Sequence, residues 1–347
     1  MDPRIILTSL VLAVFVATMT ATAGFDVPML AFEEGYSPLF GEGNLVRSVD
    51  GRNVRLILDR NSGAGFISTE MYHHGLFSAS IKLPSDYTAG IVVAFYTSNG
   101  DVFEKNHDEL DFEFLGNILG KEWRVQTNVY GNGSVSRGRE ERYNLPFDPT
   151  KEFHRYSIIW TAENIIFYID DTPIREVRRT EAMGGDYPSK PMSLYATIWD
   201  ASSWATSGGR YKVDYNYAPF VSEFTDLALL GCRLDPLQQV PSAAKNCSVE
   251  DAELMATSLA VMTPERRQAM LDFRRRYMTY SFCYDTQRYP VTFPDCDLVE
   301  SEKSRFRDTG HLRPGGSNRA TPARRAKPGK SRRIRGSGTY PKNKADM

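Results

Sequence analysis

Three carboxylic acids stand at two-residue spacing in the stretch HDELDFEFLG, which covers residues 107–116. Glu109, Asp111 and Glu113 alternate there with apolar residues. Because successive side chains of a β-strand point to opposite faces, the pattern predicts a strand with one acidic face and one packed face. Hydrolysis of a glycosidic bond requires two carboxyl groups that flank the bond, so these acids are candidates for that chemistry.

The spacing leaves the stereochemistry of such a reaction open. At about 3.3 Å per residue, the Cα atoms of Glu109 and Glu113 would lie about 13 Å apart on a flat strand. Their side chains can lean inward to the roughly 5–5.5 Å of a retaining enzyme or the roughly 6.5–9.5 Å of an inverting one. Asp111 lies between them. Three acids this close do not all ionise, so we expect coupled titrations and one protonated acid near neutral pH.

The acidic pattern is also compatible with a solvated edge strand or with a calcium site. The sequence lacks the spaced Asp/Glu loop with a central glycine that is typical of calcium sites. The run GIVVAFY, residues 90–96, is apolar enough to predict a buried neighbouring strand. This favours a central position for the acidic strand.

The elements that would position these acids are short strands. Between residues 45 and 230, runs such as NVRLILD, YSIIW and IIFYID are separated by turn residues, which predicts an all-β sandwich or jelly roll. On WRVQTNVY the amides Gln126 and Asn128 lie opposite the apolar side, and on SLYATIW the ring of Trp199 does so. Acids, amides and aromatic rings together suit an oligosaccharide, so for Trp199 and Trp204 we favour sugar binding over ordinary packing.

A small extension follows the strand-rich part of the chain. The segment TPERRQAMLDFRRRYM predicts one helix, with Thr263 as N-cap and Pro264 at the first helical position. In an oxidising compartment the four cysteines of this region would form two disulfides, and three pairings are open. We expect neighbours to pair, 232 with 247 and 283 with 296. Zinc is the alternative, but no Cys-x-x-Cys pair occurs. The cysteines are Cys232, Cys247, Cys283 and Cys296.

The two ends of the chain differ in composition from the rest. Residues 1–23 hold an early Arg4, an apolar run and a small-residue ending, which predicts a cleaved secretory signal rather than an uncleaved anchor. Residues 303–347 contain 14 Lys/Arg and two Asp with few apolar residues, which predicts a disordered basic tail. Secretion disfavours a nucleic-acid partner. The tail would either bind acidic polysaccharide or be a solvated segment without a specific partner.

The motif HDELDFEFLGN resembles the signature of the plant xyloglucan endotransglucosylase/hydrolases, members of the sixteenth glycoside hydrolase family, over roughly residues 30–298. The resemblance implies a curved jelly roll and a retaining double displacement that needs no cofactor and no metal. It makes Glu109 the nucleophile, Glu113 the general acid/base and Asp111 the helper that tunes the nucleophile.

The resemblance also implies a set of sugar contacts. The segment YMTYSFCYDTQRYP with its later FPDC resembles the family's C-terminal extension, which supports the neighbour pairing of the cysteines. The implied contacts are Gln126, Asn128 and Trp199 on the donor side, Trp204 and Gly208 on the acceptor side, Tyr280 and Arg288 for the branched acceptor, and Tyr96 as a further contact.

Some features depart from the family pattern. The glycosylation sequon that many members carry directly after the acidic strand is missing at Asn117, and sequons occur instead at Asn132 and Asn246. Ser207 stands where many members have arginine. The acceptor-side contacts of this chain are therefore expected to differ from those of such members.

These observations predict a secreted enzyme of the plant cell wall that cleaves the β-1,4-glucan backbone of xyloglucan and rejoins it to a xyloglucan or oligosaccharide acceptor. The alternatives are a xyloglucan endo-hydrolase and a non-catalytic β-glucan-binding protein. We expect a monomer without membrane or nucleic-acid partners. The predicted parts are a signal peptide (1–23), a catalytic jelly roll (24–230), a disulfide-bonded extension with one helix (231–300) and a basic disordered tail (301–347).

Overall fold

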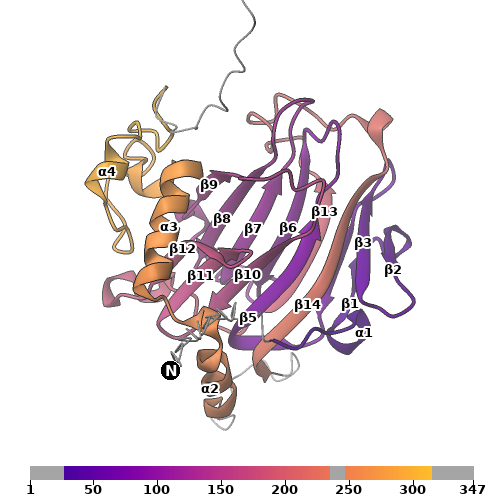
Figure 1. The fold of residues 1–347 in the computed structure, drawn as a ribbon, viewed down its shortest axis with the longest axis horizontal. Helices are drawn as coiled ribbons and strands as arrows, with labels where there is room; N and C mark the ends of the chain where they lie inside the picture. Colours follow the sequence, from indigo (N-terminus) through magenta and orange to yellow (C-terminus); the bar gives the residue numbers. More distant parts are fainter. Residues whose placement is uncertain (1–26, 235–246, 315–347) are drawn as a thin grey trace, which may run out of the picture.

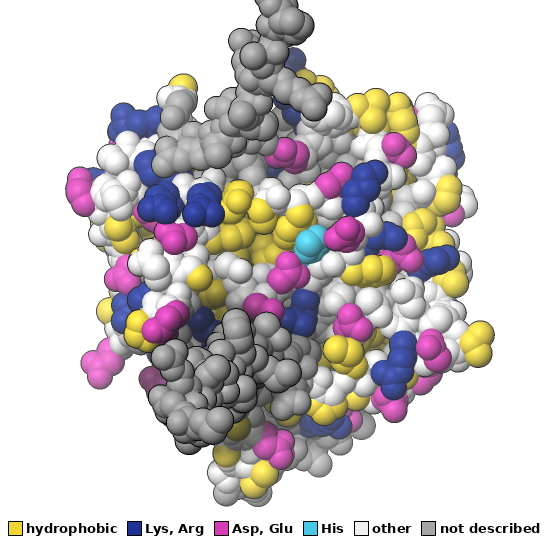
Figure 2. All heavy atoms as spheres, viewed as in Figure 1, with side chains coloured by type: hydrophobic (Ala, Val, Ile, Leu, Met, Phe, Trp, Pro, Cys, Tyr) yellow, Lys and Arg dark blue, Asp and Glu magenta, His cyan; other side chains and the backbone are white. Residues whose placement is uncertain are grey.

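The computed structural model describes residues 27–234 and 247–314 (Figure 1). The predicted signal peptide, the sequon at Asn246 and the tail from residue 315 lie outside the described residues. Two antiparallel sheets pack face to face around a shared core, which confirms the predicted all-β sandwich. Figure 2 shows basic and acidic side chains interspersed over the face of the molecule seen in Figure 1.

The first sheet has eight strands in the order β1-β4-β13-β6-β7-β8-β9-β15. In that order they span Tyr36–Phe40, Ala64–Ser68, Ser193–Asp200, Ile91–Ser98, Glu109–Leu115, Arg124–Tyr130, Glu141–Asn144 and Met278–Ser281. The second sheet has seven strands in the order β12-β11-β10-β5-β14-β3-β2. They span Thr172–Arg178, Asn164–Ile169, His154–Trp160, Met71–Lys82, Phe220–Leu234, Asn53–Leu58 and Leu45–Arg47. The acidic strand is β7, and it lies inside the eight-stranded sheet as predicted.

Core packing fixes which face β7 turns outward. Phe112 and Phe114 point between the sheets, where the ring centroid of Phe112 lies 5.2 Å from that of Phe167 on β11. The ring centroid of Phe114 lies 4.6 Å from that of Tyr156 on β10. All four rings are fully buried, and each contributes roughly 1.5–3 kcal/mol relative to an exposed side chain. A one-residue slip of β7 would expose two of these rings and bury its carboxylates instead, so the register is strongly specified.

Helices are confined to the ends of the described chain. The predicted helix is confirmed as α3, which begins directly after Thr263, and the side-chain oxygen of Thr263 accepts a hydrogen bond of 3.3 Å from the backbone N–H of Arg266. The extension holds more helix than this one segment. The α-helices are α1 (Phe32–Gly35), α2 (Ser248–Ala256), α3 (Pro264–Tyr277) and α4 (Glu300–Lys303). Short 3-10 turns cover Glu42–Asn44, Val135–Arg137, Glu181–Asp186, Tyr215–Tyr217, Ser258–Ala260 and Phe282–Tyr284.

The extension is built into the sandwich rather than attached beside it. Its strand β15 pairs with β9 and so becomes the edge of the eight-stranded sheet. Strand β14 crosses the predicted boundary at residue 230. The neighbour pairing of cysteines is confirmed by the bonds Cys232–Cys247 and Cys283–Cys296. No helix in the described ranges is both long and apolar enough to cross a membrane.

Residues 301–314 are folded, so the prediction of a disordered tail beginning at residue 301 is wrong for this segment. Phe306 is 2% exposed, and its ring stacks on that of Tyr284 with centroids 4.9 Å apart. Glu302 is also buried, and His311 forms a β-bridge with Tyr280. The composition of the stretch 303–347 concealed Phe306 and His311, because the basic residues dominate its average.

Candidate active site

A cleft of about 500 Å³ opens on the outer face of the eight-stranded sheet. The predicted site residues that line it are Tyr96, Glu109, Asp111, Glu113, Gln126, Asn128, Trp199 and Trp204. They come from β6, β7, β8, β13 and the loop after β13. Antiparallel register explains the grouping, because Glu113 lies opposite Gln126 and Asp111 opposite Asn128. The structure thus brings together acids, amides and aromatic rings as the sequence predicts.

The three acids have different surroundings on the same strand. Asp111 is buried, and burial together with the charges of Glu109 and Glu113 raises its pKa well above the usual range. Burial also raises the pKa of Glu109, but hydrogen bonds from Ser98 and Asp111 and the nearby His107 act in the opposite direction. The proton therefore stays on Asp111 and is shared in a hydrogen bond with the carboxylate of Glu109. Glu109 is left as the anionic group of the pair.

Glu113 is poised for proton transfer near neutral pH. Burial raises its pKa to about 7, and the charges of Glu140 and Glu109 add to the effect. Gln126 opposes it by donating a hydrogen bond from Nε2 to Glu113 Oε2. Gln126 is itself held by Arg142, whose Nε donates to Gln126 Oε1 at 2.5 Å. A carboxyl with such a pKa beside an anionic partner can act first as an acid and then as a base.

Aromatic rings line the ends of the cleft. Trp199 and Trp204 lie with ring centroids 6.0 Å apart, and Trp204 is 37% exposed. Tyr96 stacks on Tyr195 at 5.0 Å, and the hydroxyl of Tyr195 donates to Asp101 at 2.7 Å. Partly exposed rings held at fixed angles offer apolar faces on which the C–H face of a sugar can pack.

The residues predicted for the acceptor side are not all in the cleft. Gly208 lines a second, smaller pocket that shares Trp204 with the cleft. Tyr280 is buried beside it, and its hydroxyl donates to Asp285 at 2.9 Å. Arg288 donates to Glu140 at 2.6 Å. Neither Tyr280 nor Arg288 is among the residues that line the two pockets. Instead, both contact other residues that line these pockets.

The two predicted departures from the family pattern also have defined places. Asn132 is exposed, which suits glycosylation, and it adopts a left-handed backbone conformation with φ of 51°. Ser207 lines the second pocket and has φ of 52°. The side chain of Ser207 is much shorter than arginine, so it leaves this pocket more open than an arginine would.

Asp108 is a positioning residue that sequence reasoning missed. Its side chain is fully buried, and it accepts hydrogen bonds from the backbone N–H groups of Asn132, Ser189 and Lys190 at 2.7–2.8 Å. The ammonium of Lys190 adds an ion pair at 2.8 Å. These bonds fix the start of β7 one residue before Glu109. The sequence did contain a signal for this role. By strand alternation Asp108 falls on the face opposite the three acids, and a carboxylate buried there needs hydrogen-bond or ion-pair partners.

Phe40, Tyr130 and Glu140 also line the cleft without having been predicted as site residues. Phe40 comes from the edge strand β1, and Gly65 on the neighbouring strand leaves room for its ring: a Cβ there would lie 2.7 Å from a Phe40 ring carbon. No local pattern in the sequence marks Phe40 for this place, because only the pairing of β1 with β4 brings it there.

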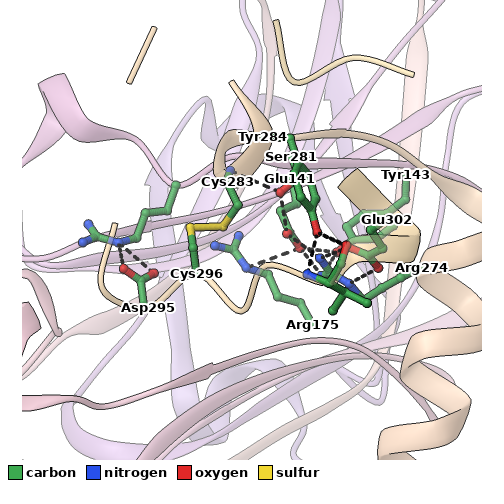
Figure 3. Close-up of a disulfide and its surroundings, with 12 residues drawn as sticks. Glu141, Tyr143, Arg175, Arg274, Ser281, Cys283, Tyr284, Asp295, Cys296 and Glu302 are labelled. Carbon is green, nitrogen blue, oxygen red and sulfur yellow. Dashed lines mark hydrogen bonds and ion pairs between the residues drawn. A yellow bond between two sulfur atoms is a disulfide. The ribbon is translucent and has the colours of Figure 1, made fainter. Parts of the chain in front are cut away.

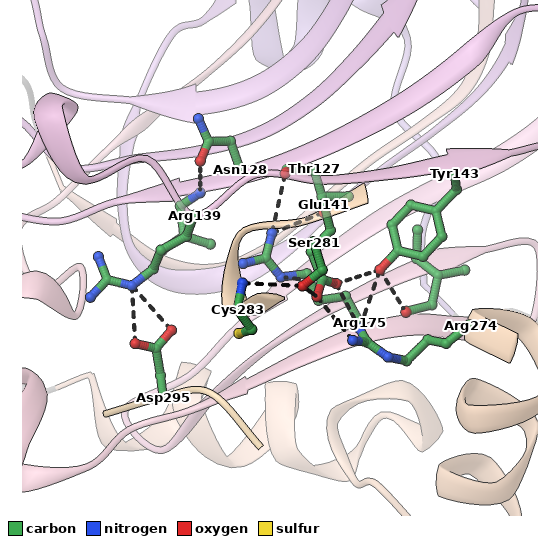
Figure 4. Close-up of polar contacts among 12 residues, drawn as sticks. Thr127, Asn128, Arg139, Glu141, Tyr143, Arg175, Arg274, Ser281, Cys283 and Asp295 are labelled. Carbon is green, nitrogen blue, oxygen red and sulfur yellow. Dashed lines mark hydrogen bonds and ion pairs between the residues drawn. The ribbon is translucent and has the colours of Figure 1, made fainter. Parts of the chain in front are cut away.

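A buried ion network ties the extension to the strands beside the acids (Figures 3 and 4). Arg274 of α3 donates to both carboxylate oxygens of Glu141 at 2.6 and 2.9 Å and to Glu302 at 3.1 Å. Arg175 of β12 lies 3.7 Å from Glu141 and donates to the backbone and side-chain oxygens of Thr127 at 3.1 and 2.9 Å. Thr127 belongs to β8, the direct neighbour of the acidic strand.

The disulfide-bonded loop is fixed by a second buried pair. Figure 3 shows the Cys283–Cys296 bond beside this network. Asp295, next to Cys296, accepts hydrogen bonds of 3.1 Å from Nε of Arg139, and Arg139 also pairs with Asp186 at 2.9 Å. The loop that carries Arg288 is therefore held at both ends against the sandwich.

Comparison with known proteins identifies relatives along almost the whole described chain. The family model for glycosyl hydrolases family 16 matches residues 32–217, and the model for the xyloglucan endo-transglycosylase C-terminus matches residues 250–296. Two Arabidopsis thaliana proteins are similar: probable xyloglucan endotransglucosylase/hydrolase protein 30 is 61% identical, with 86% of each chain covered, and protein 29 is 58% identical, with 91% of each covered. Among solved structures, a Bacillus licheniformis β-glucanase superposes with a TM-score of 0.46 at 23% identity, covering 59% of this chain and 94% of its own.

Proposed function

This chain belongs to glycosyl hydrolases family 16 and, within it, to the xyloglucan endotransglucosylase/hydrolases, and from that premise we propose that it cleaves the β-1,4-glucan backbone of xyloglucan and rejoins the new end to another xyloglucan chain. The observation that carries the proposal is the set of three acids on β7, in which a proton on Asp111 leaves Glu109 anionic while Glu113 has a pKa of about 7.

The first half of the reaction uses this distribution of protons. Glu113 gives its proton to the glycosidic oxygen as that oxygen leaves, and a carboxylate oxygen of Glu109 bonds to the anomeric carbon. Asp111 keeps its hydrogen bond to Glu109 and holds the carboxylate in place for attack. The product is a glycosyl ester of Glu109 and a free leaving chain.

The second half needs Glu113 as a base. Once Glu109 is an ester it has no charge, so its part of the repulsion that raises the pKa of Glu113 is gone, while burial and the charge of Glu140 still act. Glu113 is then a carboxylate that takes the proton of an acceptor hydroxyl, whose oxygen attacks the anomeric carbon and displaces Glu109. Two inversions at one carbon give net retention.

Whether sugar or water attacks decides between transfer and hydrolysis. Water is present at about 55 M, so transfer dominates only if a sugar hydroxyl is held in line with the ester, which is an effect of positioning. The cleft continues past Glu113 to Trp204 and the second pocket, which supports an acceptor-binding surface. We therefore favour the transferase over the hydrolase, and over a binding protein that would have no use for the intact acids.

Secretion to the cell wall and retention there by the basic tail belong to the same proposal. The relatives' names refer to xyloglucan, a polymer that only a secreted protein would meet in a wall. The predicted signal peptide supports this location, and the tail of residues 315–347 carries ten Lys/Arg and one Asp, which favours contact with acidic polysaccharide.

The stereochemical course tests the proposal directly. We expect proton NMR of a xyloglucan oligosaccharide incubated with the protein to show new β-linkages only, and any sugar released to water to appear first as the β-anomer, with the α-anomer following by mutarotation. A sharp early fall in the size of xyloglucan incubated with an excess of oligosaccharide acceptor would show internal cleavage. An α-linked product or an initial α-anomer would contradict the double displacement, and no cleavage of any β-glucan would favour the binding protein.

A further inference from the structure

One row of paired residues crosses the outer face of the sheet from the acid/base to the folded part of the tail. Glu113 on β7 lies opposite Gln126 on β8, and Gln126 lies opposite Arg142 on β9. Arg142 in turn lies opposite Tyr280 on β15, which forms a bridge with His311. The segment around His311 thus extends the catalytic sheet by one more position, beyond the C-terminal family match that ends at residue 296.

A basic pocket lies along this row. It has a volume of about 360 Å³, shares Trp204 with the catalytic cleft and is lined by Arg124, Arg142 and His311 among others. The guanidinium of Arg142 lies 5.1 Å from the ring centroid of Tyr280, and the ring of His311 lies 4.8 Å from it. The buried Tyr280 ring therefore contacts two of these three side chains, Arg142 and His311.

Among the described residues, this pocket has no carboxylate in its own lining. In residues 27–234 and 247–314 neither Arg124 nor Arg142 forms an ion pair. Arg274, by contrast, is paired with Glu141 and Glu302. Partial burial and the charge of Arg142 lower the pKa of Arg124. An anion would relieve this repulsion.

We propose that this pocket binds the carboxylate of a uronic acid residue in an anionic acceptor saccharide. The planar guanidinium of arginine matches a carboxylate with two parallel hydrogen bonds, and Arg124 and Arg142 can converge on one such group while Trp204 contacts the sugar ring. Gly208 has open space around the position of a Cβ, so the pocket is open on that side.

The role of this pocket in catalysis rests on the proposed function. An anionic acceptor held there would present a hydroxyl to the glycosyl ester: the hydroxyl oxygen bonds to the anomeric carbon, the bond from that carbon to Glu109 breaks, and Glu113 takes the proton. The donor is still xyloglucan, so the product would be xyloglucan joined to an acidic saccharide. Binding of the carboxylate itself needs none of these steps.

The first test measures binding. Isothermal titration would use two probes on the full secreted protein, an oligogalacturonide and a glucuronate-branched xylan oligosaccharide, each compared with its carboxyl-reduced form. We expect at least one acid form to bind about tenfold more tightly than its reduced form, and raising the salt concentration to diminish the difference. The probe that shows the difference identifies the source of the uronic acid.

Variants assign the preference to the pocket. In the protein lacking residues 315–347, where the basic tail cannot contribute, Arg124→Gln should remove most of the difference between acid and reduced forms, and Arg124→Lys should restore part of it. Arg52→Gln, which removes an exposed charge in the turn before β3, should leave it unchanged. A protein lacking residues 315–347 should also keep it, which excludes the tail as the binding site.

Two results would overturn the inference: equal binding of acid and reduced forms by the parent protein, or a preference that survives Arg124→Gln in the protein lacking residues 315–347. Transfer of label from xyloglucan to a neutral xyloglucan oligosaccharide, measured on the same preparation, reports on the proposed function separately. If the protein shows no such transfer but still prefers the acid forms, the proposed transferase activity is rejected and carboxylate binding in the pocket is supported.

Discussion

Glu109 and Glu113 have the same side chain, yet the structure gives them different surroundings. Glu109 stays anionic because the proton of the pair lies on Asp111, whereas burial raises the pKa of Glu113 to about 7. The identity of the three acids and the face they share were predictable from a two-residue period. The difference between their pKa values was not, because it depends on Ser98, Gln126 and Glu140, which belong to neighbouring strands and loops.

Removing the nucleophile should abolish turnover and spare binding. For Glu109→Ala we expect the rate of xyloglucan cleavage to fall by at least about 10³-fold, because no covalent intermediate can form. Affinity for a xyloglucan oligosaccharide, measured by titration, should change by less than about tenfold. Glu104→Ala is the matched control, because Glu104 is an exposed glutamate in the loop before β7 and the change keeps all three acids. Parent-like turnover in Glu109→Ala would mean that β7 is not the catalytic strand.

The pH profile should report Glu113. Glycosylation needs the protonated form, so kcat/KM should fall as pH rises through about 7, and it should also fall at low pH as Glu109 becomes protonated. Because the hydrogen bond from Gln126 lowers the pKa of Glu113, Gln126→Leu should move the alkaline limb to higher pH. Steady-state rates with a chromogenic xyloglucan oligosaccharide measure both limbs. An alkaline limb that stays in place in this variant would show that another group controls it.

At the level of elements, the extension and the catalytic sheet stabilise each other. Helix α3 packs along β12, β15 extends the sheet, and Arg274 closes the contact by binding Glu141 and Glu302. The sequence predicted α3 and both disulfides, since capping residues and cysteines are local signals. It did not predict that β15 joins the sheet, because a strand of four residues is defined only by its pairing with β9.

Arg274→Ala should weaken the whole fold. The change leaves Glu141 and Glu302 buried without their principal cation, which costs about 3–5 kcal/mol. Urea unfolding followed by tryptophan fluorescence would measure the loss. Arg275→Ala is the control, because Arg275 is exposed and its pair with Asp272 at 2.8 Å contributes about 1 kcal/mol or less. Similar losses for the two variants would contradict a structural role for the network.

The same network sets an expectation for acid stability. Burial alone would raise the pKa of Glu141, but Arg274, Arg175 and the hydrogen bonds from Arg274 and Tyr143 outweigh it and lower that pKa to about 2. The stabilisation is complete above the unfolded value of about 4.3 and is lost as pH falls through the range down to about 2. Urea unfolding at a series of pH values should show this decline in the parent. A parent stability that is flat between pH 5 and 2.5 would refute the assignment.

At the level of the whole molecule, the chain combines a folded body of mixed surface charge with a basic tail. The face in Figure 2 shows both signs interspersed, whereas residues 315–347 carry ten Lys/Arg and one Asp. Composition indicated the tail but placed its start too early, since Phe306 and Glu302 anchor residues up to 314 on the body.

Truncation after residue 314 should therefore separate retention from catalysis. We expect the shortened protein to elute from immobilised pectin at much lower salt than the parent, because roughly nine net positive charges are removed. Its turnover of soluble xyloglucan should match that of the parent. Truncation after residue 302 would also remove Phe306 and is expected to reduce the free energy of unfolding. Unchanged elution of the protein truncated after 314 would exclude the tail as the wall contact.

Transfer is distinguished from hydrolysis most sharply by incubating the secreted protein with xyloglucan and a labelled xyloglucan oligosaccharide, and following label in polymer and new reducing ends in parallel. We expect label to enter polymer faster than reducing ends appear, because the acceptor surface beyond Glu113 holds a sugar hydroxyl in place of water. Reducing ends that accumulate without incorporation of label would contradict the proposed transfer and make the enzyme a hydrolase.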